Sequence, residues 1–404
     1  MTGEQARAEG RYGTGKEISS VSRPRVAIIG AAESDYGILP GRTELELHGQ
    51  AAKRALAEAG LGREDVDGLF TVTQEFLRHP SLTVAEYLGL RPTYEDSTAV
   101  GGSSFEVLVE HAMAALQSGR IDVALVTYGS TMRSSSGRTL GTGLAIPTSP
   151  YSQQYEEPFG VNILSSYALA AQRHMYEYGT TSEQLASIAV TMRNNAARNP
   201  LAMYQDPITI DDVLASRVVA SPLHKLDCCV VSDGGGALVL VREDAVSSST
   251  KQPVWVLGAS HSNDHQIISQ MNDLTRTAAA VTGRRAMAEA GIKPDDVDLL
   301  MTYDSFTITV LLALEDLGFC AKGAGGRFAQ AGELELTGSL PTNTDGGGLS
   351  SNHPGMRGIF LVIESVRQLR GEADGRQVPN ASIAVANGVG GWLSSCATLV
   401  LGTS

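Results

Sequence analysis

The stretch AAKRALAEAGLGREDVDGLF, residues 51–70, recurs without a gap as TGRRAMAEAGIKPDDVDLLM, residues 282–301. Ten of the twenty aligned positions are identical. Each copy begins with the apolar spacing of an amphipathic helix, which a glycine closes at Gly60 or Gly291. An acidic turn and a short apolar run follow, and this order predicts a strand after the helix. The chain therefore contains one structural unit twice.

The repeat extends outward from these two stretches as a shared order of elements. In each half, an apolar strand precedes the repeat, and a glycine-rich turn after it leads into an apolar helix that is followed by two further apolar strands. In the order strand, helix, strand, strand, the ranges are 25–29, 105–117, 123–126 and 236–240 in the first half, and 254–257, 359–369, 383–386 and 397–401 in the second half. Strands without polar alternation, separated by helices, predict sheets covered on both faces. We expect a layered α/β duplication.

A long insertion, residues 130–227, interrupts the first half. It holds Ser- and Gly-rich stretches and two helical patterns, near 165–178 and 182–195. Inserted loops on a rigid scaffold usually shape a binding site, and the alternative is that the insertion builds a dimer face. The expected organisation is a flexible N-terminus (1–22), a first half (23–250) and a second half (251–404).

Composition excludes several classes of function. With 404 residues and 42% hydrophobic content, the chain can bury a large core. A formal net charge of -13 and the lack of a basic stretch argue against nucleic acid as a partner. Apolar runs fall short of the roughly 18 to 20 residues of a membrane helix, and the polar first twenty residues lack a signal core, so we expect a cytoplasmic protein.

Four cysteines, at 228, 229, 320 and 396, show no C-x-x-C spacing. We interpret them as small apolar residues in a reducing compartment and expect no metal site.

Three local motifs carry a resemblance to a known family. DGGGLSSNHPG (345–355) looks like the segment N-G-G-x-x-x-x-G-H-P-x-G, YDSF (303–306) stands where N-E-A-F or H-D-x-F occurs, and LDCCVVSDG (226–234) is similar to D-C-x-x-x-x-D-G. In this order, within a duplication, they resemble the thiolase superfamily, particularly the sterol-carrier-protein-type thiolases and lipid-transfer-protein aldolases. The resemblance implies a thiolase fold, in which two βαβαβαββ halves form layers in the order αβαβα, with an inserted loop domain in the first half.

The same resemblance shows which chemical groups are missing. Family members that form an acyl-enzyme carry a nucleophilic cysteine where this chain has Gly101, and a second, proton-exchanging cysteine where it has Gly388. Glycine supplies backbone N–H groups but no nucleophile, so any carbon–carbon chemistry is expected to be non-covalent. Ser103 is expected to cap the buried helix; as a nucleophile it would need a neighbouring base. Gly101, Ser103, Gly388 and Gly390 are predicted to bind the substrate and its oxyanion.

Four polar residues remain at positions that the resemblance assigns to the site. Pro354 is expected at the first position of the second buried helix, with His353 just outside it. His353 is expected to hold a thioester oxygen; a satisfied surface histidine is the alternative. Tyr303 can donate a hydrogen bond or, with a lowered pKa, accept a proton; otherwise it is an aromatic plug over an unused pocket. Asp304 is expected to orient a neighbour. Asp345 replaces an asparagine and is expected to place a negative charge near the site.

Retro-aldol cleavage remains possible without the two catalytic thiols. The resemblance implies a lyase that cleaves a 3-hydroxyacyl-CoA, for example one with a steroid or other branched side chain, with Tyr303 and His353 sharing the proton transfers. Two alternatives stay open: an acyltransferase that uses an atypical nucleophile or a partner subunit, and a non-catalytic acyl-CoA or lipid-binding subunit. The resemblance further implies CoA as part of the substrate with no bound cofactor, a homodimer formed through the first-half edge strand, and a DUF35-type zinc-ribbon/OB-fold partner.

Overall fold

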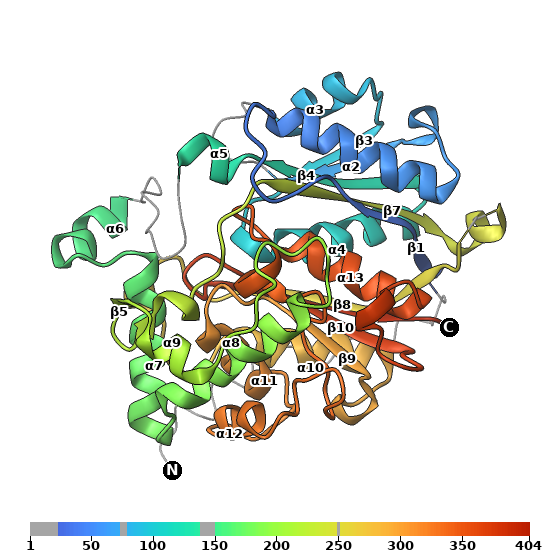
Figure 1. The fold of residues 1–404 in the computed structure, drawn as a ribbon. Helices are drawn as coiled ribbons and strands as arrows, with labels where there is room; N and C mark the ends of the chain where they lie inside the picture. Colours follow the sequence, from blue (N-terminus) through green and yellow to red (C-terminus); the bar gives the residue numbers. More distant parts are fainter. Residues whose placement is uncertain (1–22, 73–78, 138–149, 249–250) are drawn as a thin grey trace, which may run out of the picture.

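The computed structural model describes residues 23–72, 79–137, 150–248 and 251–404. The predicted flexible residues 1–22 lie outside them. Nine strands are hydrogen-bonded in the order β3-β2-β4-β7-β1-β8-β11-β10-β9, which runs through both halves (Figure 1). We call the strands of each half a half-sheet. The halves join where β1 pairs antiparallel with β8, through Ala27 with Trp255 and Ile28 with Val254.

The first half has the predicted βαβαβαββ order. Its elements are β1 (Val26–Glu33), α2 (Glu44–Ala59), β2 (Gly68–Thr71), α3 (Pro80–Leu88), β3 (Tyr94–Ser97), α4 (Ser104–Gln117), β4 (Val123–Ser130) and β7 (Gly234–Arg242). The strands β2, β3 and β4 pair in parallel, and β7 lies antiparallel to β4 and β1. The strand β3 forms the outer edge of this half-sheet.

The second half repeats this order with one reduced strand. Its elements are β8 (Val254–Asn263), α10 (Ala279–Ala290), β9 (Leu299–Thr302), α11 (Thr307–Asp316), α12 (Gly325–Gln330), α13 (Gly358–Arg370), β10 (Ile383–Gly390) and β11 (Ser395–Gly402). Where the first half has β3, residues 251–404 show only a bridge between Leu300 and Thr342. Gly60 and Gly291 both close their helices in the left-handed conformation, at φ 71°, which confirms the two predicted caps.

Five layers result, and they confirm the predicted αβαβα arrangement. In Figure 1, α2 and α3 cover the upper half-sheet, α4 and α13 lie between the half-sheets, and α10 and α11 lie below. The middle helices contact strands of both halves. Most of their residues are buried, polar ones included, because both of their sides face a sheet.

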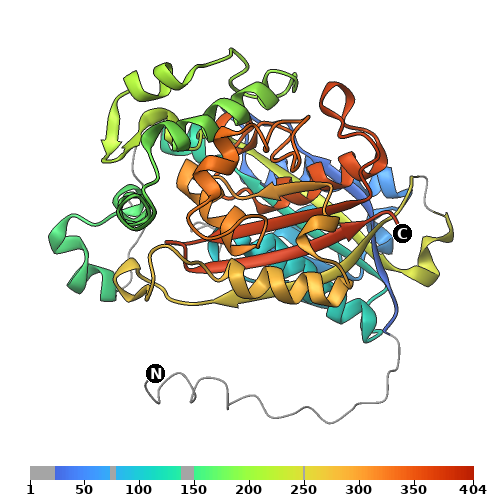
Figure 2. The same ribbon diagram turned by 90° about the horizontal axis from the view of Figure 1, so that it is seen from below.

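The insertion between β4 and β7 lies beside the second half in both ribbon views (Figure 2). Its described elements are α5 (Met132–Ser136), α6 (Pro150–Tyr155), α7 (Ile163–Tyr178), α8 (Ser182–Ala196), α9 (Ile210–Ala215), β5 (Val218–Ala220) and β6 (Leu223–His224), so the two predicted helices are confirmed. The helix α8 packs on a π-helical turn, η8 (Gly347–Ser351). The side chains of Asn195 and Asn199 donate hydrogen bonds to the carbonyls of Thr342 and Asp345. The insertion thereby fixes the segment that precedes His353.

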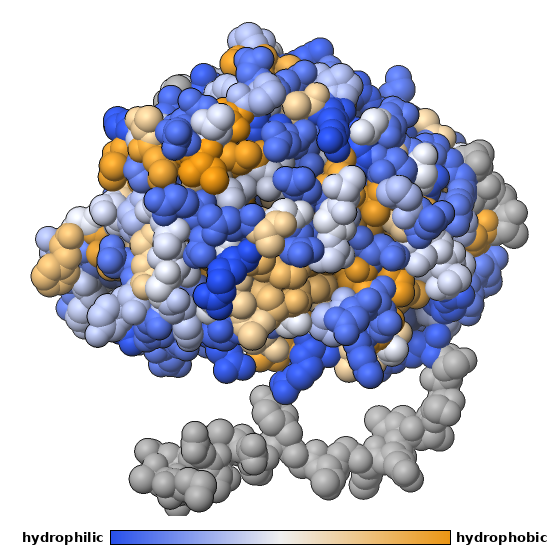
Figure 3. All heavy atoms as spheres, turned by 60° about the horizontal axis from the view of Figure 1, so that its bottom comes forward, coloured by the Kyte–Doolittle hydropathy of each residue, from blue (hydrophilic) through white to orange (hydrophobic). Residues whose placement is uncertain are grey.

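The outer surface is mainly polar on the face shown in Figure 3, where apolar residues gather in separate patches. Among the described residues, helices long and apolar enough to cross a membrane do not occur.

Candidate active site

Tyr303 and His353 meet in the structure, although fifty positions separate them in the sequence. Tyr303 directly follows β9, and its backbone N–H donates to the carbonyl of Asn387 in β10 at 2.9 Å. Its hydroxyl lies 2.9 Å from Nε2 of His353, and the rings meet edge to face at 85°. Two residues predicted separately therefore form one hydrogen-bonded unit, which we call the Tyr303–His353 pair.

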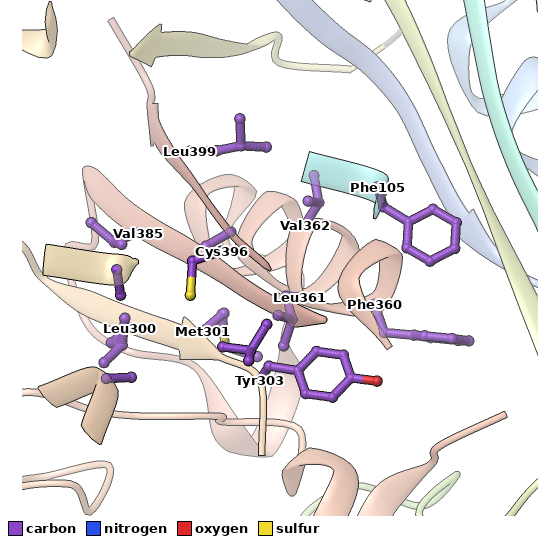
Figure 4. Close-up of a cluster of buried hydrophobic side chains, with 14 of the residues drawn as sticks. Phe105, Leu300, Met301, Tyr303, Phe360, Leu361, Val362, Val385, Cys396 and Leu399 are labelled. Carbon is purple, nitrogen blue, oxygen red and sulfur yellow. The ribbon is translucent and has the colours of Figure 1, made fainter. Parts of the chain in front are cut away.

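Burial determines the protonation state of the phenol. Tyr303 is only 4% exposed, and Figure 4 shows its hydroxyl directed away from the apolar cluster that holds Leu300 and Met301. Burial raises the pKa of Tyr303 well above its usual value, and the neighbouring Cys229 adds to this. Tyr303 was predicted to accept a proton if its pKa were lowered, but the shift of its pKa is in the opposite direction. At neutral pH, Tyr303 carries its proton and can donate it.

Two hydrogen bonds with Ser232 fix the backbone of His353, which does not stand at the start of a helix. Its N–H donates to Oγ of Ser232 at 3.0 Å, and its carbonyl accepts from the N–H of Ser232 at 3.2 Å. The helix α13 begins only at Gly358, so the expectation that Pro354 opens this helix is wrong. Gly355, at a left-handed φ of 85°, allows a turn before the helix, and Ser232 of the first half fixes the backbone of His353.

A buried charge cluster supports the turn below the pair. Asp304 accepts hydrogen bonds from the N–H groups of Gly348 at 2.7 Å and Leu349 at 3.1 Å, as expected of a residue that orients its neighbours. The fully buried Arg357 forms an ion pair with Asp345 at 2.5 Å and lies 3.5 Å from Asp304. Because Arg357 neutralises Asp345, the expected free negative charge near the site is not present.

The predicted glycine positions converge on the same place. The turn η2 (Gly101–Ser103) packs against the end of β10, and Gly101 has a left-handed φ of 81°. A Cβ on Gly101 would lie 2.4 Å from the backbone nitrogen of Gly391, and one on Gly102 would lie 2.1 Å from Cε2 of Tyr303. A Cβ on Gly390 would lie 1.8 Å from the carbonyl oxygen of Val100. The backbone of this turn therefore closes directly over the phenol.

Ser103 occupies the N-cap position of α4, as expected, but its side chain forms no capping hydrogen bond. Its hydroxyl donates to Oγ of Ser395 at 2.9 Å and lies 3.5 Å from the carbonyl oxygen of Val100. Within the described ranges, these hydrogen-bond partners include no base. The nucleophile alternative for Ser103 therefore gains no support.

Cys229 lies closer to the pair than its sequence position suggested. It was predicted only as a small apolar residue, yet its N–H donates to the carbonyl of Ser305, two residues after Tyr303, at 2.9 Å. Burial is the main cause of the raised pKa values of Tyr303 and Tyr167, and Cys229 contributes to both. Cys229, Ser232 and Arg357 are the neighbours that sequence reasoning missed, because no local pattern shows which distant segment a side chain faces.

Gly101→Ala tests how closely the glycine turn is packed. We expect a loss of stability of at least about 2 kcal/mol, since the left-handed conformation alone costs roughly 1 to 2 kcal/mol and the Cβ also meets Gly391. Gly119→Ala is the matched control because Gly119 has a φ of 68° with nothing within 4 Å of its Cβ position. Denaturant unfolding of both variants gives the difference; equal losses would mean that the turn has room for a side chain.

Comparisons with known proteins place this geometry in a family. A family model described as thiolase C-terminal domain-like matches residues 260–403. The steroid side-chain-cleaving aldolase of Thermomonospora curvata is 35% identical over 382 residues, which cover 92% of this chain and 97% of that protein. The acetyl-CoA acetyltransferase of Methanothermobacter thermautotrophicus is also 35% identical, over 377 residues that cover 91% and 96%.

A solved structure agrees with these relatives. The Ltp2-ChsH2(DUF35) aldolase superposes with a TM-score of 0.85 at 32% identity, over 94% of this chain and 98% of that chain. The similarity extends over both halves and the insertion between them, well beyond the region that the family model covers. The chain belongs to the thiolase superfamily.

Proposed function

We propose that this protein is a carbon–carbon lyase that cleaves a 3-hydroxyacyl-CoA into a carbonyl compound and a shorter acyl-CoA, without an acyl-enzyme. Relatives named as an aldolase and as an acetyltransferase are equally similar, so overall similarity does not choose between the two reactions. The observation that carries the proposal is the Tyr303–His353 pair beneath a turn with glycine at 101.

The pair supports the first proton transfer of a retro-aldol cleavage. The substrate hydroxyl gives its proton to the oxygen of Tyr303 while Tyr303 passes its own proton to Nε2 of His353. This relay suits a phenol whose pKa is raised, because no free phenolate has to accumulate. The bond between the α- and β-carbons then breaks, the β-carbon becomes a carbonyl, and the electron pair moves into the thioester enolate. Backbone N–H groups of the glycine turn are suited to hold the enolate oxygen.

We propose a branched or steroid side chain as the acyl group, on the precedent of the relative whose name states that it cleaves steroid side chains. CoA takes part as a portion of the substrate, and the relay requires neither a bound cofactor nor a metal ion. The reaction is proposed to occur in the cytoplasm.

The proposed assembly has two interfaces. The strand β3 at the sheet edge leaves one row of backbone groups available for antiparallel pairing with a second copy, so we propose a homodimer through β3. We also propose a DUF35-type partner, because the solved aldolase that superposes over the whole chain is named with such a subunit.

Acyl transfer is the second candidate, and Cys229 is the observation that favours it. Cys229 is partly exposed, and its backbone binds Ser305, two residues after Tyr303. This reading predicts CoA-dependent cleavage of a 3-oxoacyl-CoA.

The deciding experiment uses the purified protein with and without a DUF35-type partner. We expect a 3-hydroxy-3-branched acyl-CoA to yield equal amounts of a carbonyl compound and acetyl- or propionyl-CoA, with no need for free CoA. No release from this substrate, together with CoA-dependent cleavage of a 3-oxoacyl-CoA, would replace the lyase by the acyltransferase.

A further inference from the structure

Glu106 is a fully buried carboxyl group that the relay does not use. It belongs to the first turn of α4, between the two half-sheets, and is 0% exposed. Among the described residues, neither Oε1 nor Oε2 has a hydrogen-bond partner. Leaving a buried carboxylate without a partner costs several kcal/mol, so such groups usually take up a proton. Here burial raises the pKa of Glu106 to about 8.

Glycines form the wall between this carboxyl group and the Tyr303–His353 pair. A Cβ on Gly388 would lie 2.3 Å from Oε2 of Glu106, and one on Gly358 would lie 2.5 Å from the same oxygen. The carboxyl group therefore fills the space that a side chain at position 388 would need. The carbonyl oxygen of Gly102 lies 2.4 Å from the same Cβ position of Gly358, and Gly102 packs on the ring of Tyr303. One backbone segment separates the acid from the phenol.

We propose that Glu106 is the second proton-transfer group of the site and protonates the α-carbon of the thioester enolate. This inference rests on the proposed lyase function and completes its proton balance. The relay leaves the hydroxyl proton of the substrate on the Tyr303–His353 pair, and the enolate carbon needs a proton from another group. Glu106 gives that proton and becomes a carboxylate; after the products leave, it takes up one proton from the opened site and the pair releases the one that it holds, so the protein ends in its starting protonation state.

The position of Glu106 supports this role, in addition to its protonation state. The α-carbon and the hydroxyl of a 3-hydroxyacyl thioester are separated by the β-carbon, so the base and the acid must approach from different sides. The Tyr303–His353 pair belongs to the loops after β9 and η8, whereas Glu106 comes from α4 beneath the glycine turn. Oε2 of Glu106 lies in the space of a side chain at position 388, which is where the family resemblance places the proton-exchanging cysteine.

Glu106→Gln tests the assignment, because the amide keeps the size and hydrogen-bonding groups of the acid but cannot give up a proton. We expect its kcat for cleavage, and its rate of α-deuterium incorporation into acetyl- or propionyl-CoA in D2O, to fall by roughly 10² to 10⁴. The KM for the CoA thioester should stay within about threefold, which a loss of structure would not allow. Glu110→Gln is the matched control, since Glu110 lies one turn along α4, is partly exposed and pairs with His261.

The pH dependence of kcat is a second test of the role of Glu106. A donor with a pKa of about 8 predicts that wild-type kcat falls as pH rises above about 8, because the acid ionises. Glu106→Asp retains the acid and moves it back by one methylene; it should keep this limb at a lower kcat, and it replaces the Gln variant should the latter not fold.

Cleavage and exchange by Glu106→Gln at wild-type rates would overturn the assignment of Glu106 and leave the lyase intact. A wild-type protein that neither cleaves the 3-hydroxyacyl-CoA nor exchanges the α-protons would overturn the lyase itself.

Discussion

Tyr303→Phe is expected to lower the kcat for 3-hydroxyacyl-CoA cleavage by roughly 10² to 10⁴, the usual range for losing a proton-transfer group. The phenylalanine ring keeps the packing of Tyr303 on Gly102 but removes the hydroxyl that lies 2.9 Å from His353. Without it, the substrate hydroxyl has no relay to Nε2. Steady-state kinetics on the purified variant measure the effect, and KM should stay close to the wild-type value.

Tyr36→Phe is the control for this substitution. Tyr36 is a partly buried tyrosine, and burial raises its pKa to about 12, but it packs edge to face on Phe360 rather than on His353. It should keep near wild-type turnover. If Tyr303→Phe turns over like the wild type, the site has been placed incorrectly.

Arg357→Met is expected to destabilise the fold by about 3 to 5 kcal/mol. Arg357 is fully buried, and its removal leaves the carboxylates of Asp345 and Asp304 without the cation that both face. The hydrogen bonds from Arg357 to the carbonyl and side chain of Asn352 disappear as well, next to His353. Denaturant unfolding should therefore show a large shift of the midpoint.

Arg54→Met is the matched control for the charge cluster. Arg54 also pairs with an aspartate, Asp35, at 2.7 Å, but their side chains are 45% and 47% exposed. Solvent screens this pair, so its loss should cost about 0 to 1 kcal/mol. Similar losses in the two variants would show that the buried cluster does not support the segment that carries His353.

The fold could be predicted because its signals are local and occur twice. Helix caps such as Gly60 and Gly291, and apolar strands without polar alternation, follow from short-range rules that each half satisfies independently. The reduced counterpart of β3 in the second half could not be predicted in this way, since Thr342 pairs with Leu300, which is 42 positions away in the sequence.

The site was predictable only in part. Motifs predicted Tyr303 and His353 as site residues but not the hydrogen bond between them. Pro354 predicted the start of a helix, but the chain turns at Gly355 and the helix begins only at Gly358. The partners of Arg357 come from two turns, and the carboxyl group of Glu106 lies in a space formed by both halves. In the sequence, Glu106 is one of two glutamates in a largely apolar helix, and its burial appears only once the half-sheets close around α4.

The most direct test of non-covalent cleavage is the intact mass of the protein, quenched during steady-state turnover of a 3-hydroxyacyl-CoA. We predict the unmodified mass while the carbonyl compound and the short acyl-CoA accumulate in equal amounts, and the same result for Cys229→Ser. A protein that gains the mass of an acyl group during turnover, and loses both this adduct and its activity in Cys229→Ser, would contradict the account.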